Sequence, residues 1–147
     1  MTIHTATAER MSGAELQMIR EYLGLTGSDL AEMLRVRADT VRAWETGRDP
    51  VSFRARDEIA DIARTTRATV DELVTRLKKT DSTRTVEIYR RDHDFHTAHP
   101  EHDHMPARWW RHVAARVTEQ LPDVTIVKHP LTRSADAHAD GGDTCRG

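Results

Sequence analysis

Arginine is concentrated between positions 35 and 56, where it could contact a polyanion. The segment holds six arginines against three acidic residues, a local excess of three positive charges in a 147-residue chain of net charge -2. The arginines are Arg35, Arg37, Arg42, Arg48, Arg54 and Arg56. A guanidinium makes forked contacts with phosphate or guanine, so this local excess of arginine suggests nucleic-acid recognition. The net charge of the whole chain gives no such indication. The alternative is a solvated helix bundle with scattered arginines.

Residues 38–46 are expected to form a helix that ends at Gly47. At about 100° per residue, Val41 and Trp44 point inward, towards a core. The opposite face carries Asp39, Arg42, Ala43 and Thr46, with Ala38 at its edge. Short side chains around one long cation suit a major groove about 12 Å wide, whereas a merely solvated helix needs no small residues there.

Two further helices should hold this helix in place. Ser12 and Glu15 form a capping box that begins the first helix, and Gly24 ends it. Thr26, with Asp29 three residues later, begins the second. Apolar residues recur at helical spacing in both helices: Leu16, Ile19 and Leu23, then Leu30, Met33 and Leu34. Two short helices and a tight turn, followed by a third helix ending in glycine, indicate a helix-turn-helix.

Residues 12–60 resemble the Cro/C1-type (XRE) helix-turn-helix family. The resemblance lies in Leu25-Thr26, Leu30-Ala31, Val41 and Trp44-Glu45-x-Gly47. It implies a lambda-repressor-like DNA-binding domain of four or five helices. It also implies that Thr26 and Ser28 contact phosphate, that Trp44 packs in the core and that Glu45 braces the following loop. The chain departs from the family at Gly27, Arg35 and Arg37, where Gln, Gly, and Ser or Thr are frequent.

The residues expected to contact DNA are Thr26, Ser28, Arg35, Arg37, Ala38, Asp39, Thr40, Arg42, Ala43 and Arg48. Arg42 is the first candidate for reading a guanine, a contact that contributes roughly 1–3 kcal/mol of discrimination, and a phosphate contact is its alternative. Asp39 either accepts from a cytosine amino group or orients Arg42. Ala38 and Ala43 permit close approach to thymine methyl groups. Phosphate contacts are expected from Arg35, Arg37, Arg48 and Arg54.

A longer apolar repeat follows Ser52 and predicts a helix of about 25 residues. Positions 55, 59, 62, 66, 70, 73 and 77 recur at alternating steps of four and three. Because so short a chain cannot bury so long a stripe, we expect it to pack on the same helix of a second copy. The alternative is a helix that breaks near Thr65-Thr66, with each half packed locally.

Alternating residues predict strands at 85–89 and 124–128. Between them we expect a short helix near 90–98, a histidine-rich loop and a helix over 106–121, which gives a βααβ unit. Two strands alone are marginal in water, so this unit should pack on the long helix or on a second subunit. The expected dimerisation residues are Ile62, Val70, Leu73, Leu77, Trp110, Val113 and Val117.

The predicted fold is mainly α, and α+β overall. We expect a disordered segment at 1–11, a helix-turn-helix domain with its long helix at 12–80, a small dimerisation domain at 84–130 and a disordered tail at 131–147. The whole chain is similar to phage-encoded anti-CRISPR-associated autorepressors and to YdiL-like regulators. The C-terminal pieces that carry this second resemblance are Val86–Arg90, His99-Pro100-Glu101-His102, Trp110-Arg111 and Val124–Val127.

Histidines crowd the segment between positions 92 and 104. They are His93, His96, His99, His102 and His104, interspersed with Asp92, Asp94, Glu101 and Asp103. Such clusters can bind zinc or nickel. However, the histidines recur about every third residue rather than as two separated ligand pairs, and Pro100 breaks any single helical face. We therefore expect adventitious metal affinity, with no metal site and no cofactor; a metal or pH sensor is the alternative.

Two functional hypotheses are compatible with the helix-turn-helix. The first is a homodimeric repressor of its own phage or mobile-element operon, which binds an inverted repeat in double-stranded DNA and excludes polymerase without catalysis. The second is a DNA-binding antitoxin whose residues 84–130 also bind a toxin protein. A metal-dependent enzyme is a third reading, but no catalytic residue is expected. The lone Cys145, the lack of a membrane-length apolar run and a signal-free N-terminus indicate the cytoplasm of a bacterial or phage-infected cell.

Overall fold

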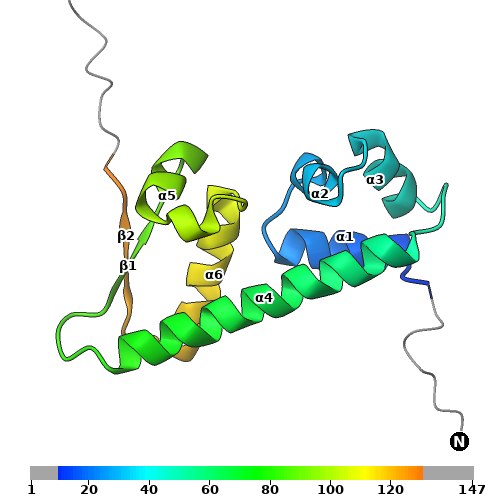
Figure 1. Ribbon diagram of the computed structural model, residues 1–147. Helices are drawn as coiled ribbons and strands as arrows, with labels where there is room; N and C mark the ends of the chain where they lie inside the picture. The colour runs from blue at the N-terminus through cyan, green and yellow to red at the C-terminus, as the bar shows by residue number, and fades with distance from the viewer. Residues whose placement is uncertain (1–9, 131–147) are drawn as a thin grey trace, which may run out of the picture.

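Two lobes sit on one long helix in the computed structural model (Figure 1). The structure describes residues 10–130; segments 1–9 and 131–147, which contain most of the predicted disordered ends, lie outside the described residues. Helices α1 to α3 cover the N-terminal half of α4, and α5, α6 and the two strands cover its C-terminal half. The predicted class, mainly helical with a small sheet, is confirmed.

The N-terminal lobe contains α1 (Gly13–Tyr22), α2 (Gly27–Leu34) and α3 (Ala38–Glu45). The backbone N–H of Glu15 donates to Ser12 Oγ at 3.1 Å, and the chain leaves α1 through Gly24 at a φ of +73°. Thr26 and Asp29 form the predicted capping box, with hydrogen bonds of 2.8 and 3.0 Å. These local signals therefore begin and end the helices where the sequence predicts.

The turn between α2 and α3 requires a left-handed residue. Arg35 takes that conformation, with φ 57° and ψ 44°, at the position where the resembled family has glycine. The left-handed region costs a side-chain-bearing residue roughly 1–2 kcal/mol. After α3, Gly47 takes the same region at no such cost, with a φ of +81°.

Helix α4 (Phe53–Lys78) runs unbroken for 26 residues, about 39 Å at 1.5 Å per residue. Its apolar stripe contacts α1 in the first lobe and α6 in the second. Thr66 lies buried within this stripe, where its hydroxyl donates to Ile62 O at 2.7 Å and accepts from Trp109 Nε1 at 3.0 Å. The expected helix of about 25 residues is therefore confirmed, and the alternative break near Thr65 is wrong. The expectation that so short a chain cannot bury the stripe is corrected, because the chain's own lobes bury most of it.

The C-terminal lobe contains β1 (Thr85–Ile88), α5 (Asp92–Ala98), the 3-10 helix η1 (Pro100–His102), α6 (Ala107–Gln120) and β2 (Thr125–Lys128). The strands pair in parallel, with Thr85 opposite Thr125 and Ile88 opposite Lys128. Helix α6 lies between β1 and α4 and contacts both. The two strands thus gain the support that an isolated pair lacks.

The residues expected to form the dimer interface belong to the core of the chain's own fold. Five of them are buried there: Val70, Leu77, Trp110, Val113 and Val117. Ile62 and Leu73 are partly buried against the same core. The periodicity shows that a stripe is buried but not which element buries it. Whether Ile62 and Leu73, which are only partly buried, also contact a second copy stays a prediction.

None of the helices within residues 10–130 combines the length and hydropathy that a membrane crossing requires.

Candidate nucleic-acid interface

The exposed face of α3 forms one surface with the start of α2 and with part of α1. One shallow hollow is lined by ten residues from these helices: Gln17, Arg20, Thr26, Gly27, Ser28, Ala38, Val41, Arg42, Glu45 and Thr46. A second is lined by Asp39, Arg42, Ala43, Thr46 and Arg48. Arg42 and Thr46 line both hollows and therefore form the ridge between them. The structure brings most of the predicted DNA-contacting residues onto one continuous surface.

The cations of this surface are available to a polyanion. Arg37 and Arg42 are exposed, and no ion pair engages either of them within residues 10–130. The Arg48 side chain is 72% exposed, and its ion pair with Asp49 is long at 3.9 Å. The N-terminus of α2 lies beside Arg42 and adds the positive end of a helix dipole.

Ala43 is a correction to the sequence prediction. A helical wheel places Ala43 on the outward face, but the residue is only 2% exposed. The loop after α3 folds back over it: Ala43 O accepts from the backbone N–H of Asp49 at 3.1 Å and from Thr46 Oγ1 at 3.3 Å. Ala43 therefore cannot reach a thymine methyl group. A helical wheel could not show this, because a segment outside the helix covers the residue.

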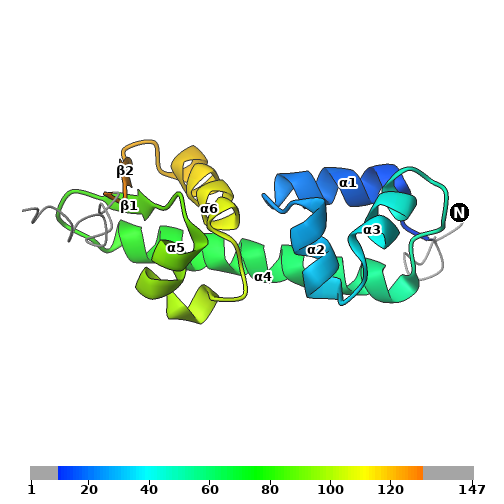
Figure 2. The same cartoon turned by 90° about the horizontal axis from the view of Figure 1, so that it is seen from above.

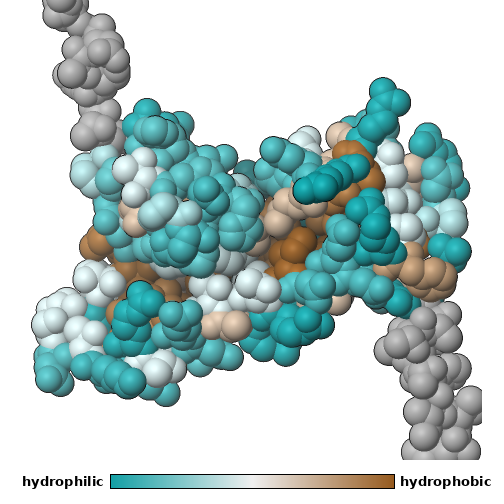
Figure 3. Space-filling model, viewed as in Figure 1, coloured by the Kyte–Doolittle hydropathy of each residue, from teal (hydrophilic) through white to brown (hydrophobic). Residues whose placement is uncertain are grey.

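Arg35 and Arg54 do not share the α3 surface with Arg42. Arg35 lines a separate hollow between the lobes, together with Glu32 and Asp103. Apolar side chains gather between the lobes in Figure 3, above the middle of α4. Arg54 donates to Leu34 O at 3.0 Å and pairs with Glu58 at 3.1 Å, so it secures the end of α2. Arg54 thus has a structural role in addition to its predicted phosphate contact, which stays a prediction.

An ion pair beneath the surface was missed by the sequence analysis. Arg20 Nε donates to Glu45 Oε1 at 2.8 Å, and Arg20 Nη1 donates to Leu25 O at 3.0 Å. The two side chains are only 15% and 12% exposed. Glu45 therefore ties α3 to α1 and does not brace the following loop as expected. The sequence holds no signal for this pair, because 25 residues separate its members.

The chain entering α1 is also ordered by contacts that the sequence analysis did not foresee. Arg10, expected in a disordered segment, donates through Nη1 to Val51 O at 3.1 Å. Its guanidinium lies 4.6 Å from the centre of the Phe53 ring, and Arg56 covers the same ring at 4.9 Å. Met11 packs against the core. These contacts fix the start of α4 beside the α3 surface.

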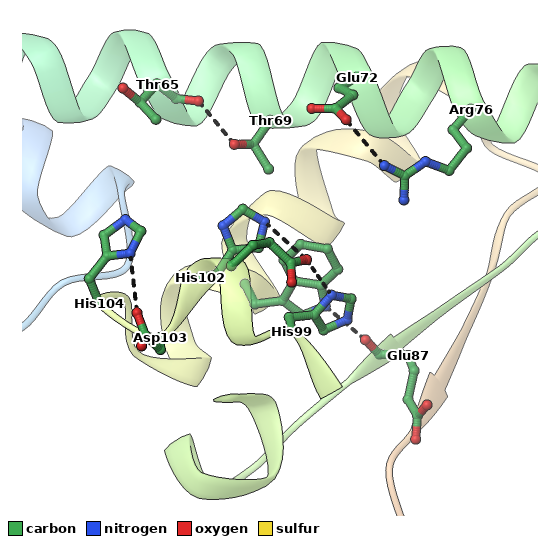
Figure 4. Close-up of polar contacts among 11 residues, drawn as sticks. Thr65, Thr69, Glu72, Arg76, Glu87, His99, His102, Asp103 and His104 are labelled. Carbon is green, nitrogen blue, oxygen red and sulfur yellow. Dashed lines mark hydrogen bonds and ion pairs between the residues drawn. The ribbon is translucent and has the colours of Figure 1, made fainter. Parts of the chain in front are cut away.

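The histidine-rich segment forms an aromatic packing cluster. His99 lies 4.5 Å from Trp110 and His102 lies 5.1 Å from Trp109, ring centre to ring centre. His96 Nε2 contacts Met105 O at 2.6 Å. Figure 4 shows His99 and His102 facing the α4 side that carries Thr69, Glu72 and Arg76. Within residues 10–130, no group of three or more potential ligands is placed to hold a metal ion.

Burial makes His102 a source of pH-dependent stability. Desolvation against the tryptophans lowers the pKa of His102 below its usual 6.5, although Glu101 acts in the opposite direction. The unfolded chain therefore takes up the proton first. We expect the contribution of His102 to the free energy of unfolding to be fully present above about pH 6.5. This contribution should be lost as the pH falls below that value.

Chemical denaturation of His102→Gln between neutral and mildly acidic pH tests this expectation. The variant should lose part of the wild-type pH dependence, because its amide cannot titrate. His104→Gln, at a side chain that is 61% exposed, is the matched control and should keep the wild-type profile. If the two variants behave alike, burial of His102 is not the cause.

The two lobes, the exposed arginine-bearing face and the histidines packed against tryptophans define a small, mainly helical protein. Residues 11–125 match the family model described as Aca2/YdiL-like, so the chain belongs to that family. This confirms the similarity to YdiL-like regulators and supports a regulatory protein. A comparison with curated proteins gives no match. The narrower Cro/C1-type assignment stays a prediction.

Proposed function

We propose that this protein is a transcriptional repressor that binds a specific sequence in double-stranded DNA through the α3 surface. The observation that carries the proposal is the exposed Arg42, which stands between two hollows without an ion-pair partner in residues 10–130. A guanidinium placed in this way can fork onto guanine O6 and N7 in the major groove. Membership of the Aca2/YdiL-like family supports a regulatory role of this kind.

The residues around Arg42 have distinct roles in this proposal. Arg37 and Arg48, at the two ends of α3, bind phosphate and set the register. The hydroxyl of Ser28 and the N-terminal N–H groups of α2 bind a further phosphate. Asp39 either accepts from a cytosine amino group or orients Arg42 one turn along the helix. Ala38 leaves room for the base edges.

The protein acts as a homodimer on an inverted repeat and represses its own operon, which is carried by a phage or mobile element. Two copies of the α3 surface enter major grooves about 34 Å apart, one turn of the duplex. Occupancy of the operator excludes polymerase, so the mechanism needs no catalytic group and no cofactor.

Fluorescence anisotropy with a duplex from the chain's own upstream region tests the proposal. Arg42→Ala should weaken binding about 5- to 150-fold, as a lost base contact of roughly 1–3 kcal/mol implies. Arg64→Ala, which removes an exposed arginine from α4, is the control and should bind like the wild type. Wild-type affinity should also fall about 10³- to 10⁵-fold between 50 and 200 mM salt, if six to ten phosphates are contacted. A wild-type chain that ignores this DNA at low salt refutes the proposal.

A further inference from the structure

A cavity of about 340 Å³ lies in the C-terminal lobe, between α4 and the segments that form β1 and η1. Its volume is within the range of roughly 300–1,000 Å³ that small-molecule sites occupy. Side chains from α4, β1, η1 and α6 line it, so tertiary packing brings its walls together. Figure 2 shows β1, α5 and α6 at the opposite end of α4 from α3, so the cavity is separate from the α3 surface.

One wall of the cavity is aromatic. The Trp110 ring lies 4.5 Å from the ring of His99 and 5.8 Å from that of His102, centre to centre. Trp110 Nε1 donates to Glu87 O at 2.8 Å, which fixes the orientation of the indole. Val86 of β1 adds an apolar side chain. Because the face of an indole attracts a cation within about 6 Å of its centre, this wall favours a ligand that joins an apolar body to a positive charge.

The charged side chains around the cavity leave one carboxylate without a matching arginine or lysine. Glu72 pairs with Arg76 at 3.2 Å across one turn of α4. Glu87 contacts His129 Nδ1 at 2.6 Å. Arg76 is the single arginine or lysine among the residues that line the cavity. The third carboxylate, that of Glu101, is therefore the one that a cationic ligand would meet.

Glu101 lies beside the aromatic wall. Its ion-pair contacts within residues 10–130 are with histidines, at 3.2 Å to His99 Nδ1 and 3.8 Å to His102 Nε2. A backbone hydrogen bond holds the pKa of Glu101 below its usual value, so the carboxylate is charged at neutral pH. Burial lowers the pKa of His102, so that ring is neutral there and supplies no counter-charge. Figure 4 shows His99 and His102 across the cavity from Glu72 and Arg76.

We propose that this cavity binds a small organic amine, whose ammonium group pairs with Glu101 and whose apolar body lies against Trp110. An ammonium gains a charge-assisted hydrogen bond to the carboxylate and attraction to the indole face together. Within residues 10–130, no group of three or more potential ligands is placed to hold a metal ion, which favours an organic cation. The inference goes beyond the proposed function and does not depend on it, because the cavity shares no residue with the hollows beside Arg42.

An NMR titration of the full, isotope-labelled chain with phenethylamine tests the site. The amine should give saturable shifts with a dissociation constant on the order of 1 mM, typical of so small a ligand. The indole N–H signal of Trp110 should move, because this ring lines the cavity. The signal of Trp44, which is buried in the N-terminal lobe, should not. Phenethyl alcohol, which has the same body without the charge, should bind at least about tenfold more weakly.

Three variants locate the ammonium group. Glu101→Gln keeps the size of the side chain and removes its charge, so it should weaken phenethylamine binding at least about tenfold. Glu119→Gln is the matched control, because Glu119 is exposed on α6 and does not line the cavity; it should bind the amine like the wild type. Since the Glu101 side chain is 59% exposed, both variants should unfold at the wild-type temperature. Thr69→Phe fills the cavity from α4 and should abolish saturable binding.

The outcomes separate this site from the proposed repressor. Saturable shifts at Trp110 that weaken in Glu101→Gln but not in Glu119→Gln support the site, whether or not the chain binds DNA. The site is overturned if tens of millimolar amine give no saturable shift, if phenethyl alcohol binds as tightly as the amine, or if binding persists in Thr69→Phe. Tighter binding of phenylalanine than of phenethylamine also overturns it, because Arg76 and a ligand carboxylate would then determine the affinity. A failure to bind the operator counts only against the repressor.

Discussion

Replacing Trp109 by alanine is expected to lower the free energy of unfolding by about 3–5 kcal/mol, as for other large-to-small changes in a packed core. Trp109 is 1% exposed and lies where α6 meets α4. Its ring contacts Phe95, His102 and Trp110, and its Nε1–H donates to the buried Thr66 hydroxyl. Since a domain of this size is stable by only about 5–15 kcal/mol, the loss would leave it marginal.

Two further variants separate the packing of Trp109 from its hydrogen bond in urea denaturation. Thr66→Val keeps the volume but leaves the indole N–H buried without an acceptor, which should cost about 1–3 kcal/mol. Trp109→Phe keeps most of the apolar contact and should cost less than the alanine variant. A loss below about 1 kcal/mol in Trp109→Ala would mean that the α4–α6 joint is not a packed core.

The elements that could be predicted from the sequence are those whose signals are local. Ser12, Thr26 and Asp29 set helix starts through hydrogen bonds that reach three residues, and the structure has these bonds. Gly24 and Gly47 end helices through their own backbone conformations. The sequence also predicts that Ser28, Ala38 and Arg42 lie on one surface, because their positions depend only on two short helices and the turn between them.

The features that could not be predicted depend on contacts between distant segments. The apolar stripe of α4 was recognised as buried, but its partner was not, because covering by α6 and covering by a second copy give the same periodicity. Ala43 looked exposed on a wheel that contains no following loop. The spacing of the histidines argued against a metal site, but it could not show that the rings pack against Trp109 and Trp110. In each case the residue types indicated the kind of contact, but the sequence could not show which distant segment makes that contact.

Glu45→Ala is expected to destabilise the fold by about 3 kcal/mol, near the lower end of the values for breaking a buried ion pair. The estimate sits at that end because both side chains keep slight exposure, 15% for Arg20 and 12% for Glu45. The guanidinium would keep Leu25 O as an acceptor and would lose its close counter-charge, leaving only the longer, 3.8 Å pair with Glu21. Glu58→Ala is the control, since its pair with Arg54 is exposed on one helix and should contribute at most about 1 kcal/mol.

The same substitution distinguishes electrostatic attraction from positioning at the α3 surface. Removing Glu45 takes a negative charge from the hollow beside Arg42, which by itself should strengthen binding to any duplex. It also releases α3 from α1, so Arg42 is no longer held in one direction. If positioning dominates, anisotropy titrations should show operator affinity falling while affinity for an unrelated duplex holds or rises. A parallel rise for both duplexes would show that Glu45 acts on DNA only through its charge.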